Sequence, residues 1–294
     1  MLRSLKNALL EHAGPVYRVL MIPMRMGAGL RYVGADLGRV LAWAIGSRED
    51  TNYTYDLTEL NLHYLAHLVA VATATPVEQC RRYVAEAAED NELHRHIAEL
   101  TRQSGNRWNS DLQPRFARRL GWYAMVRATR PRLVVETGVD KGLGSVLLCS
   151  ALLKNAAEGF AGEYRGTDIN PRAGWLLAGR YAACGRILYG DSITSLRDLA
   201  GPIDLFINDS DHSADYEARE YQVIAEKLSA HAIVISDNAH VSDALCRFSE
   251  KRGRDFLYLN EQPLGHWYPG AGIGVSLPKV RPPPRGDGQA VARA

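Results

Sequence analysis

The stretch RLVVETGVDKGLGSVLLC, residues 132–149, gives the clearest indication of the fold. It begins with a short apolar run, which predicts a buried strand, and it ends with the composition of a helix. Gly138, Gly142 and Gly144 lie between the two, so the backbone can pass close to a ligand and direct a helix N-terminus towards it. Leu147 stands where the dinucleotide fingerprint G-x-G-x-x-G would need a small residue, so the turn is not typical of a nicotinamide or flavin site.

The alternation of strand and helix continues as far as residue 279. Helical segments, one of them expected at residues 173–184, separate the first five strands, which indicates right-handed crossovers and a mainly parallel sheet. The last two strands have no helix between them and are expected to form an antiparallel hairpin. We therefore predict a Rossmann-like α/β fold with a seven-stranded sheet, whose strands are expected at residues 132–138, 164–169, 186–191, 203–209, 232–238, 256–262 and 272–279.

The chain is expected to divide into three parts. Upstream of residue 115 the apolar residues recur at helical spacing, and Thr58 is placed to cap one of the helices. Residues 1–114 are interpreted as an N-terminal helical region that serves as a lid, as an oligomer contact, or as both. Residues 115–279 are interpreted as the α/β domain. Residues 280–294 are rich in proline, glycine and arginine, and are expected to be disordered.

The composition is that of a soluble globular protein. Hydrophobic residues make up 46% and charged residues 23% of the chain, and the net charge of +2 calls for no nucleic-acid partner. The four cysteines are scattered without metal-binding spacing, which favours a reducing, cytoplasmic location. Charged residues and Pro15 interrupt the N-terminus before an apolar segment is long enough for a signal peptide.

Residues 16–47 are apolar but are interrupted by four arginines, so a transmembrane helix is not expected. The arginines could lie on one side of an amphipathic segment that contacts a membrane or a partner subunit. The alternative is an ordinary packed pair of helices with solvated arginines.

Acidic residues follow three successive strands of the predicted sheet. Glu136 precedes the glycine turn, and Asp168 and Asp191 end the second and third strands. Ligands of such sheets bind beyond the carboxyl ends of the strands. Three acids there suit a ligand with an amine, a ribose and an adenine amino group, and they would repel a pyrophosphate.

The motifs VVETGVDKGLGS, TDI, YGDS and DLFIND together resemble those of class I S-adenosylmethionine-dependent methyltransferases, over roughly residues 115–279. The resemblance implies that Glu136 and Gly138 hold the methionine part of the cofactor, Asp168 its ribose and Asp191 its adenine edge. It extends the cofactor-binding set to Thr137, Gly142, Gly144, Ser145, Ser192 and Asp209. One departure is an insertion, EGFAGEY, which lengthens the interval before Asp168 beyond the about 20 residues usual in such units.

A second group of polar residues follows the fourth and fifth strands. Asp209 ends the fourth, and Asp237 and Asn238 end the fifth. Adjacent parallel strands lie about 5 Å apart, so these side chains are expected to converge. Two carboxylates and an amide oxygen are hard ligands that suit Mg²⁺ or another divalent cation. The sequence therefore predicts a metal site, with Asp211 as an alternative ligand to Asp209.

This second group resembles metal-dependent O-methyltransferases. Catechol O-methyltransferase has an acid after the fourth strand and an Asp-Asn pair after the fifth. The macrocin- and mycinamicin-type sugar O-methyltransferases have D-x-x-H after the fourth strand, here Asp209 to His212, and two acids after the fifth. The resemblance implies His212 as general base for a hydroxyl acceptor bound at the metal. The alternative is that His212 only forms the turn.

Weaker patterns suggest where the acceptor binds. The segment TNYTYDLTELN could form a lid through Tyr53, Tyr55 and Asp56, or it could simply lead into a helix. His240 is a second candidate base. The loop between the last two strands could line the acceptor site, or only form a hairpin, with its residues His266, Trp267 and Tyr268.

Together these patterns predict a cofactor- and Mg²⁺-dependent O-methyltransferase that acts on a hydroxyl of a small molecule, such as a sugar or a secondary-metabolite scaffold. A homo-oligomer is expected. The alternatives are a metal-independent N- or O-methyltransferase, in which Asp209 and Asp237 only accept hydrogen bonds, and a non-catalytic cofactor-binding scaffold protein.

Overall fold

The computed structural model describes residues 14–49 and 54–279, and the chain forms two compact units. The smaller unit consists of residues up to Ser47 together with Gly265–Tyr268, and the larger unit of the remainder. Tyr53 and the predicted disordered tail lie outside the described residues.

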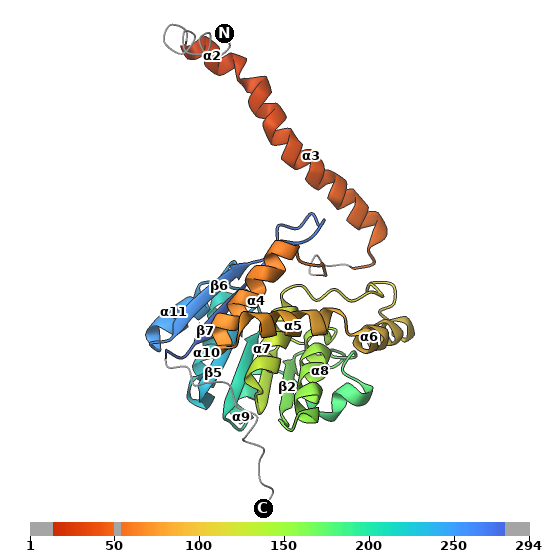
Figure 1. Ribbon diagram of the computed structural model, residues 1–294, viewed down its shortest axis with the longest axis vertical. Coiled ribbons are helices and arrows are strands. Elements are labelled where there is room, and N and C mark those ends of the chain that lie inside the picture. Colours follow the sequence, from red (N-terminus) through yellow and green to blue (C-terminus); the bar gives the residue numbers. More distant parts are fainter. Residues whose placement is uncertain (1–13, 50–53, 280–294) are drawn as a thin grey trace, which may run out of the picture. The chain divides into compact units, whose positions relative to one another are not determined.

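The larger unit is built on a seven-stranded sheet with the order β3-β2-β1-β4-β5-β7-β6 (Figure 1). Strands β1 to β5 run parallel, and β7 pairs antiparallel with both β5 and β6. The fold class predicted from the sequence is therefore confirmed. The strands are β1 (Leu133–Thr137), β2 (Glu163–Asp168), β3 (Gly185–Tyr189), β4 (Ile203–Asn208), β5 (Leu228–Ser236), β6 (Asp255–Asn260) and β7 (Gly272–Leu277).

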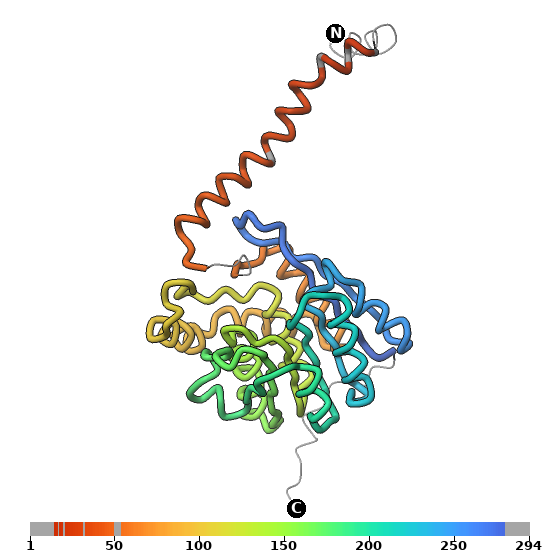
Figure 2. The backbone as a smooth tube through the Cα atoms, turned by 180° about the vertical axis from the view of Figure 1, so that it is seen from behind, coloured from red at the N-terminus to blue at the C-terminus, as the bar shows by residue number. Residues whose placement is uncertain are grey.

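Helices cover both faces of this sheet. Helices α4 (Glu59–Thr73), α5 (Val77–Ala88), α7 (Arg119–Thr129) and α8 (Leu143–Ala157) pack in sequence against one another on one face (Figure 1). Helices α9 (Ser192–Asp198), α10 (Ala214–Ile224) and α11 (Ala244–Lys251) cover the other face, which Figure 2 presents from behind. Helix α6 (Asn91–Gln103) and the short 3₁₀ helices η1 (Gly179–Ala183) and η2 (Ala225–Lys227) complete the unit.

Local sequence signals explain where several of these helices begin. The hydroxyl of Thr58 accepts a hydrogen bond from the Asn61 amide, as predicted for a cap of α4. Asp90 and Asp191 cap α6 and α9 in the same way. The helix expected at residues 173–184 does not form, and only η1 lies there. Gly174 and Gly179 have φ angles of +73° and +56°, which interrupt a right-handed helix.

The smaller unit contains α2 (Gly14–Leu20), α3 (Ile22–Gly46) and the loop of residues 265–268. The Trp43 ring contacts Trp267 and His266, with ring centroids 5.5 Å and 6.2 Å apart. Among the described helices, none combines the length and the apolar character needed to cross a membrane.

The central strands supply the core, and Phe206 of β4 is fully buried between β1, β5 and the helices of one face. Phe206→Ala should lower the free energy of unfolding by about 3–5 kcal/mol, because it removes buried apolar surface and leaves a cavity. Urea unfolding measures the change. Leu60→Ala, at a half-exposed position of α4, is the control and should change it by less than about 0.5 kcal/mol. Equal effects of the two substitutions would contradict this description of the core.

Candidate functional site

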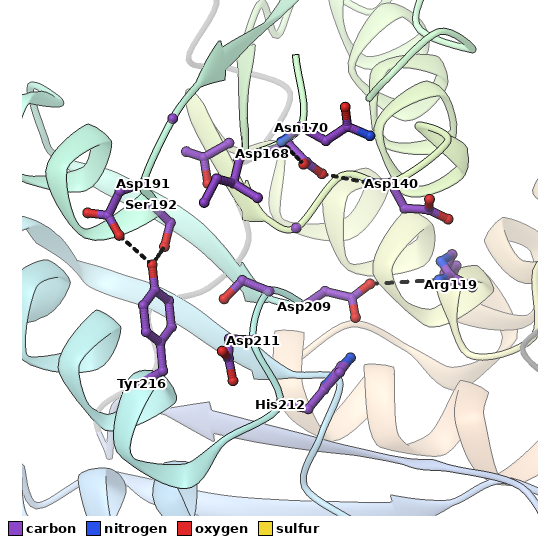
Figure 3. Close-up of a pocket in the computed structure, with 15 residues that line it drawn as sticks. Arg119, Asp140, Asp168, Asn170, Asp191, Ser192, Asp209, Asp211, His212 and Tyr216 are labelled. Atoms are coloured by element: carbon purple, nitrogen blue, oxygen red, sulfur yellow. Dashed lines mark hydrogen bonds and ion pairs between the residues drawn. The ribbon is translucent and has the colours of Figure 1, made fainter. Parts of the chain in front are cut away.

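A cavity of about 630 Å³ opens at the carboxyl ends of β1 to β4 (Figure 3). The sheet order reverses between β1 and β4, and open α/β sheets bind ligands at such a point. Residues that directly follow the four strands line the cavity, together with Arg119 from α7 and Tyr216 from α10. Its volume lies within the about 300–1,000 Å³ usual for small-molecule sites.

The glycine turn after β1 forms one wall, and its packing leaves no space for side chains. A Cβ atom on Gly138, which has a φ of +78°, would lie 1.9 Å from the Asp209 carbonyl oxygen. A Cβ on Gly144 would lie 2.2 Å from Glu136 Oε1. Gly142, with a φ of +91°, forms the N-cap of α8. The predicted turn is therefore present, and its main chain lies directly against the end of β4.

Asp168 holds this turn in place. One of its carboxylate oxygens accepts hydrogen bonds from the Val139 and Asp140 amides at 3.0 and 2.9 Å, and the other accepts from the Asn170 amide at 2.8 Å. Asp168 also lines the cavity (Figure 3). The same carboxylate thus fixes the turn and faces the space where a ligand would lie.

Glu136 lies beneath the turn and does not line the cavity. It is buried and accepts hydrogen bonds from the hydroxyls of Ser145, at 3.2 Å, and of Tyr164. Burial raises its pKa to about 7. Among the other predicted cofactor ligands, Gly138, Asp168, Asp191, Ser192 and Asp209 line the cavity, whereas Thr137, Gly142, Gly144 and Ser145 do not.

Asp191 and Ser192 are brought together with Tyr216. The Tyr216 hydroxyl donates a 2.7 Å hydrogen bond to Asp191 and lies 2.9 Å from the Ser192 hydroxyl (Figure 3). The hydrogen bond from Tyr216 lowers the pKa of Asp191. Sequence reasoning missed Tyr216, whose only signal was its position in the helix that follows the D-x-x-H motif.

A buried acid below this group, Glu220, was also missed. Its carboxylate accepts hydrogen bonds from Thr137 at 3.1 Å and from Ser210 at 2.9 Å, and also from Ser192 and Asn208. Burial raises its pKa to about 7. Glu220 therefore ties the ends of β1 and β4 to the residue that opens α9.

Arg118 binds the acidic residues that follow β5 and β6. Its buried guanidinium makes a bidentate ion pair with Asp237 and donates to Glu261 at 2.9 Å. The Tyr55 hydroxyl donates to the same Glu261 carboxylate at 2.7 Å. Burial alone would raise the pKa of Asp237, but the charge of Arg118 holds it well below its usual range. Burial and the Asp237 charge raise the pKa of the adjacent Asp209.

The arrangement of Asp209, Asp237 and Asn238 does not support the predicted divalent-metal site. The two carboxyl groups do approach each other, but the guanidinium of Arg118 already neutralises Asp237. The Asn238 side-chain nitrogen donates to the His212 carbonyl at 2.9 Å. Among residues 14–49 and 54–279, no group of three or more His, Cys, Asp or Glu side chains is placed to hold a metal ion.

Arg119 contributes a positive charge to the cavity and was not singled out in the sequence. Its guanidinium lies 3.7 Å from the Asp209 carboxylate and stacks over Trp122, 5.3 Å from the ring centroid. His212 lines the cavity near Asp209, as the close-up shows (Figure 3). The only sequence signal for this charge was the pair Arg118-Arg119 at the start of a predicted helix, which was not recognised as part of a site.

The residues predicted to contact the acceptor do not lie together in the structure. Tyr55 is fully buried in the Arg118 network, and Asp56 pairs with Arg115 at 3.8 Å. His240 is partly buried, and burial followed by the charge of Arg118 lowers its pKa. None of these three lines the cavity, and His266, Trp267 and Tyr268 belong to the smaller unit.

Fold and cavity together define a Rossmann-like protein with a ligand site at the switch point of its sheet. Residues 135–239 match the family described as a methyltransferase domain. This match supports the enzyme class that the sequence predicts, a methyltransferase.

Solved structures that resemble the chain include methyltransferases from fungi and bacteria. PaMTH1 from Podospora anserina, bound to SAH, is 17% identical, with 69% of this chain and 96% of that chain covered and a TM-score of 0.46. The O-methyltransferase TomG from Streptomyces achromogenes is 17% identical, with 65% and 92% covered and a TM-score of 0.47. A putative caffeoyl-CoA O-methyltransferase from Staphylococcus aureus is 14% identical, with 66% and 99% covered and a TM-score of 0.46. No curated protein matches the chain.

The buried Glu220 predicts a specific pH dependence of stability. Its folded pKa of about 7 lies above its ordinary value of 4.5, so the folded state binds more protons between these pH values. The free energy of unfolding should therefore fall as pH rises from about 4.5 to about 7, by on the order of 3 kcal/mol from this group. Glu220→Gln should flatten that slope in urea unfolding, whereas Glu99→Gln, at an exposed position of α6, should leave it unchanged. An equally steep slope in Glu220→Gln would refute the assignment.

Proposed function

We propose that the protein transfers a methyl group from S-adenosylmethionine to a hydroxyl of a small molecule. The observation that carries the proposal is the cavity at the switch point, where the glycine turn and the acids of three strand ends lie around one space. S-adenosylmethionine would supply an electrophilic methyl group on its sulfonium.

The residues of the cavity fit this cofactor. The close approach of Gly138 to the end of β4 provides main chain without side-chain obstruction. Asp168 would take ribose hydroxyls, and Asp191 would lie at the adenine edge. Asp209 and the turn would face the methionine part. Acidic residues outnumber the arginine in the lining, which complements the positive sulfonium and amine.

The same residues do not fit a divalent cation, because the guanidinium of Arg118 already neutralises Asp237. No step is therefore assigned to a metal, and the metal-independent alternative is preferred. Arg119 and His212 remain as the groups that face an acceptor. The histidine would take the hydroxyl proton, and the arginine would orient the oxygen.

Gly138→Ala tests the cofactor site. Its Cβ would overlap the Asp209 carbonyl, so the affinity for S-adenosylhomocysteine in calorimetry should fall by about tenfold or more. Gly159→Ala is a matched control, since Gly159 has a φ of +93° and no atom within 4 Å of the added Cβ. The control should lose some stability and keep its affinity. If the unmodified protein binds no S-adenosylhomocysteine, the proposed function is wrong.

His212→Ala tests the base. Release of S-adenosylhomocysteine in the presence of phenolic and sugar acceptors measures turnover, which should fall by about 10²–10⁴-fold without loss of cofactor affinity. His231→Ala, at an exposed position of β5, is the control and should keep full turnover. Chelation should leave turnover unchanged if Arg118 replaces a metal. Cofactor binding without turnover on any acceptor would favour the scaffold alternative.

A further inference from the structure

The smaller unit exposes a long apolar helix. Within α3, large apolar side chains are 47–86% exposed, namely those of Ile22, Met24, Met26, Leu30, Val33, Leu37, Leu41 and Ile45. Contiguous apolar surface of this extent is unfavourable in water and marks an interaction site. Among the described residues of the smaller unit, none buries these side chains, so we expect a binding partner to do so.

Six of these eight exposed side chains form one stripe along α3. Ile22, Met26, Leu30, Val33, Leu37 and Leu41 follow one another at intervals of three or four residues, which places them on one face. At 100° per residue, the three arginines of the helix, Arg25, Arg31 and Arg39, lie outside this stripe. The one acidic residue of α3, Asp36, pairs with Arg39 at 2.9 Å and leaves an excess of positive charge.

We propose that α3 lies on the surface of an anionic lipid bilayer, with the apolar stripe inserted between the headgroups and the arginines directed to lipid phosphates. An amphipathic helix with basic residues outside its apolar face is typical of this arrangement. None of the described helices meets the requirements for spanning, so binding at the surface is the geometry that α3 allows. This proposal goes beyond the proposed function and does not rest on it.

Charge and composition favour lipid over a second copy of the chain. A second copy would bring the same excess of arginine, whereas an anionic surface complements it. Five of the 25 residues of α3 are glycine, namely Gly27, Gly29, Gly34, Gly38 and Gly46. Glycine has no side chain for knobs-into-holes packing against a second helix. It also destabilises a helix that is exposed to water.

An aromatic cluster at the end of α3 supports the same assignment. Trp43 packs against Trp267, whose ring centroid also lies 6.2 Å from that of Tyr268, and all three belong to the smaller unit. Tryptophan and tyrosine are the residues most favoured at the boundary between lipid and water. The cluster would lie at the headgroup level beside the C-terminal turn of the helix.

Co-sedimentation of the full chain with vesicles tests the proposal. The protein should sediment with vesicles of mixed phosphatidylcholine and phosphatidylglycerol, and more weakly with phosphatidylcholine alone. Replacing Arg25, Arg31 and Arg39 by glutamine should lower the partition coefficient by about fivefold per arginine, or on the order of a hundredfold in all. Added salt should weaken the binding of the unmodified protein in the same direction.

A matched pair of double substitutions separates the stripe from general surface effects. Leu30→Gln with Leu37→Gln should abolish sedimentation. Ala28→Gln with Ala35→Gln, at positions that are also exposed but lie on the opposite side of α3, should preserve it. An unchanged free energy of unfolding in urea in all variants shows that the larger unit is intact. The proposal is overturned if neither vesicle binds the protein. It is also overturned if sedimentation equilibrium detects a self-associated form that the Leu30 and Leu37 changes dissociate, without vesicle binding.

Discussion

One buried guanidinium holds the carboxyl edge of the sheet together. Arg118, the N-cap residue of α7, links the start of this helix to Asp237 beyond β5 and to Glu261 just beyond β6. Through Glu261 it also fixes Tyr55, which precedes α4. Two carboxylates buried at one edge would repel each other and force protonation without such a partner. A buried pair of this kind is worth little in net stability, but loss of one partner costs about 3–5 kcal/mol. Its effect is therefore to enforce one arrangement of helices and strand ends.

This ion pair also determines the charge that a ligand meets. With Asp237 neutralised, the described lining of the cavity sets one arginine, Arg119, against five acidic residues, namely Asp140, Asp168, Asp191, Asp209 and Asp211. A ligand that carries positive charge is thus favoured near the ends of β1 to β4. Arg119, held by Trp122 on one side and Asp209 on the other, provides the only fixed positive charge of that lining for an acceptor oxygen.

Much of the fold could be predicted because its signals are local. The apolar runs, the glycine turn and the acids that end strands are each visible within a dozen residues. Nothing in the sequence indicated that an arginine would pair with Asp237 where we expected a metal ion. Arg118 precedes Asp237 by 119 residues, and no sequence pattern links the two. Tyr216 and Glu220 escaped notice for a related reason, because polar residues on a helix indicate a partner only after the helix is packed. The false helix at residues 173–184 had suitable composition, but two glycines with positive φ overrode it.

The double role of Asp168 has a thermodynamic consequence. Because this carboxylate already accepts hydrogen bonds from the Val139 and Asp140 amides, the main chain of the turn is ordered before any ligand binds. The loss of backbone entropy is then part of folding and does not weaken binding. The same coupling works in reverse, since a ligand that engages Asp168 also stabilises the turn. A ligand that binds only the ordered turn therefore makes local opening of residues 138–140 less favourable, by an amount set by its affinity and concentration.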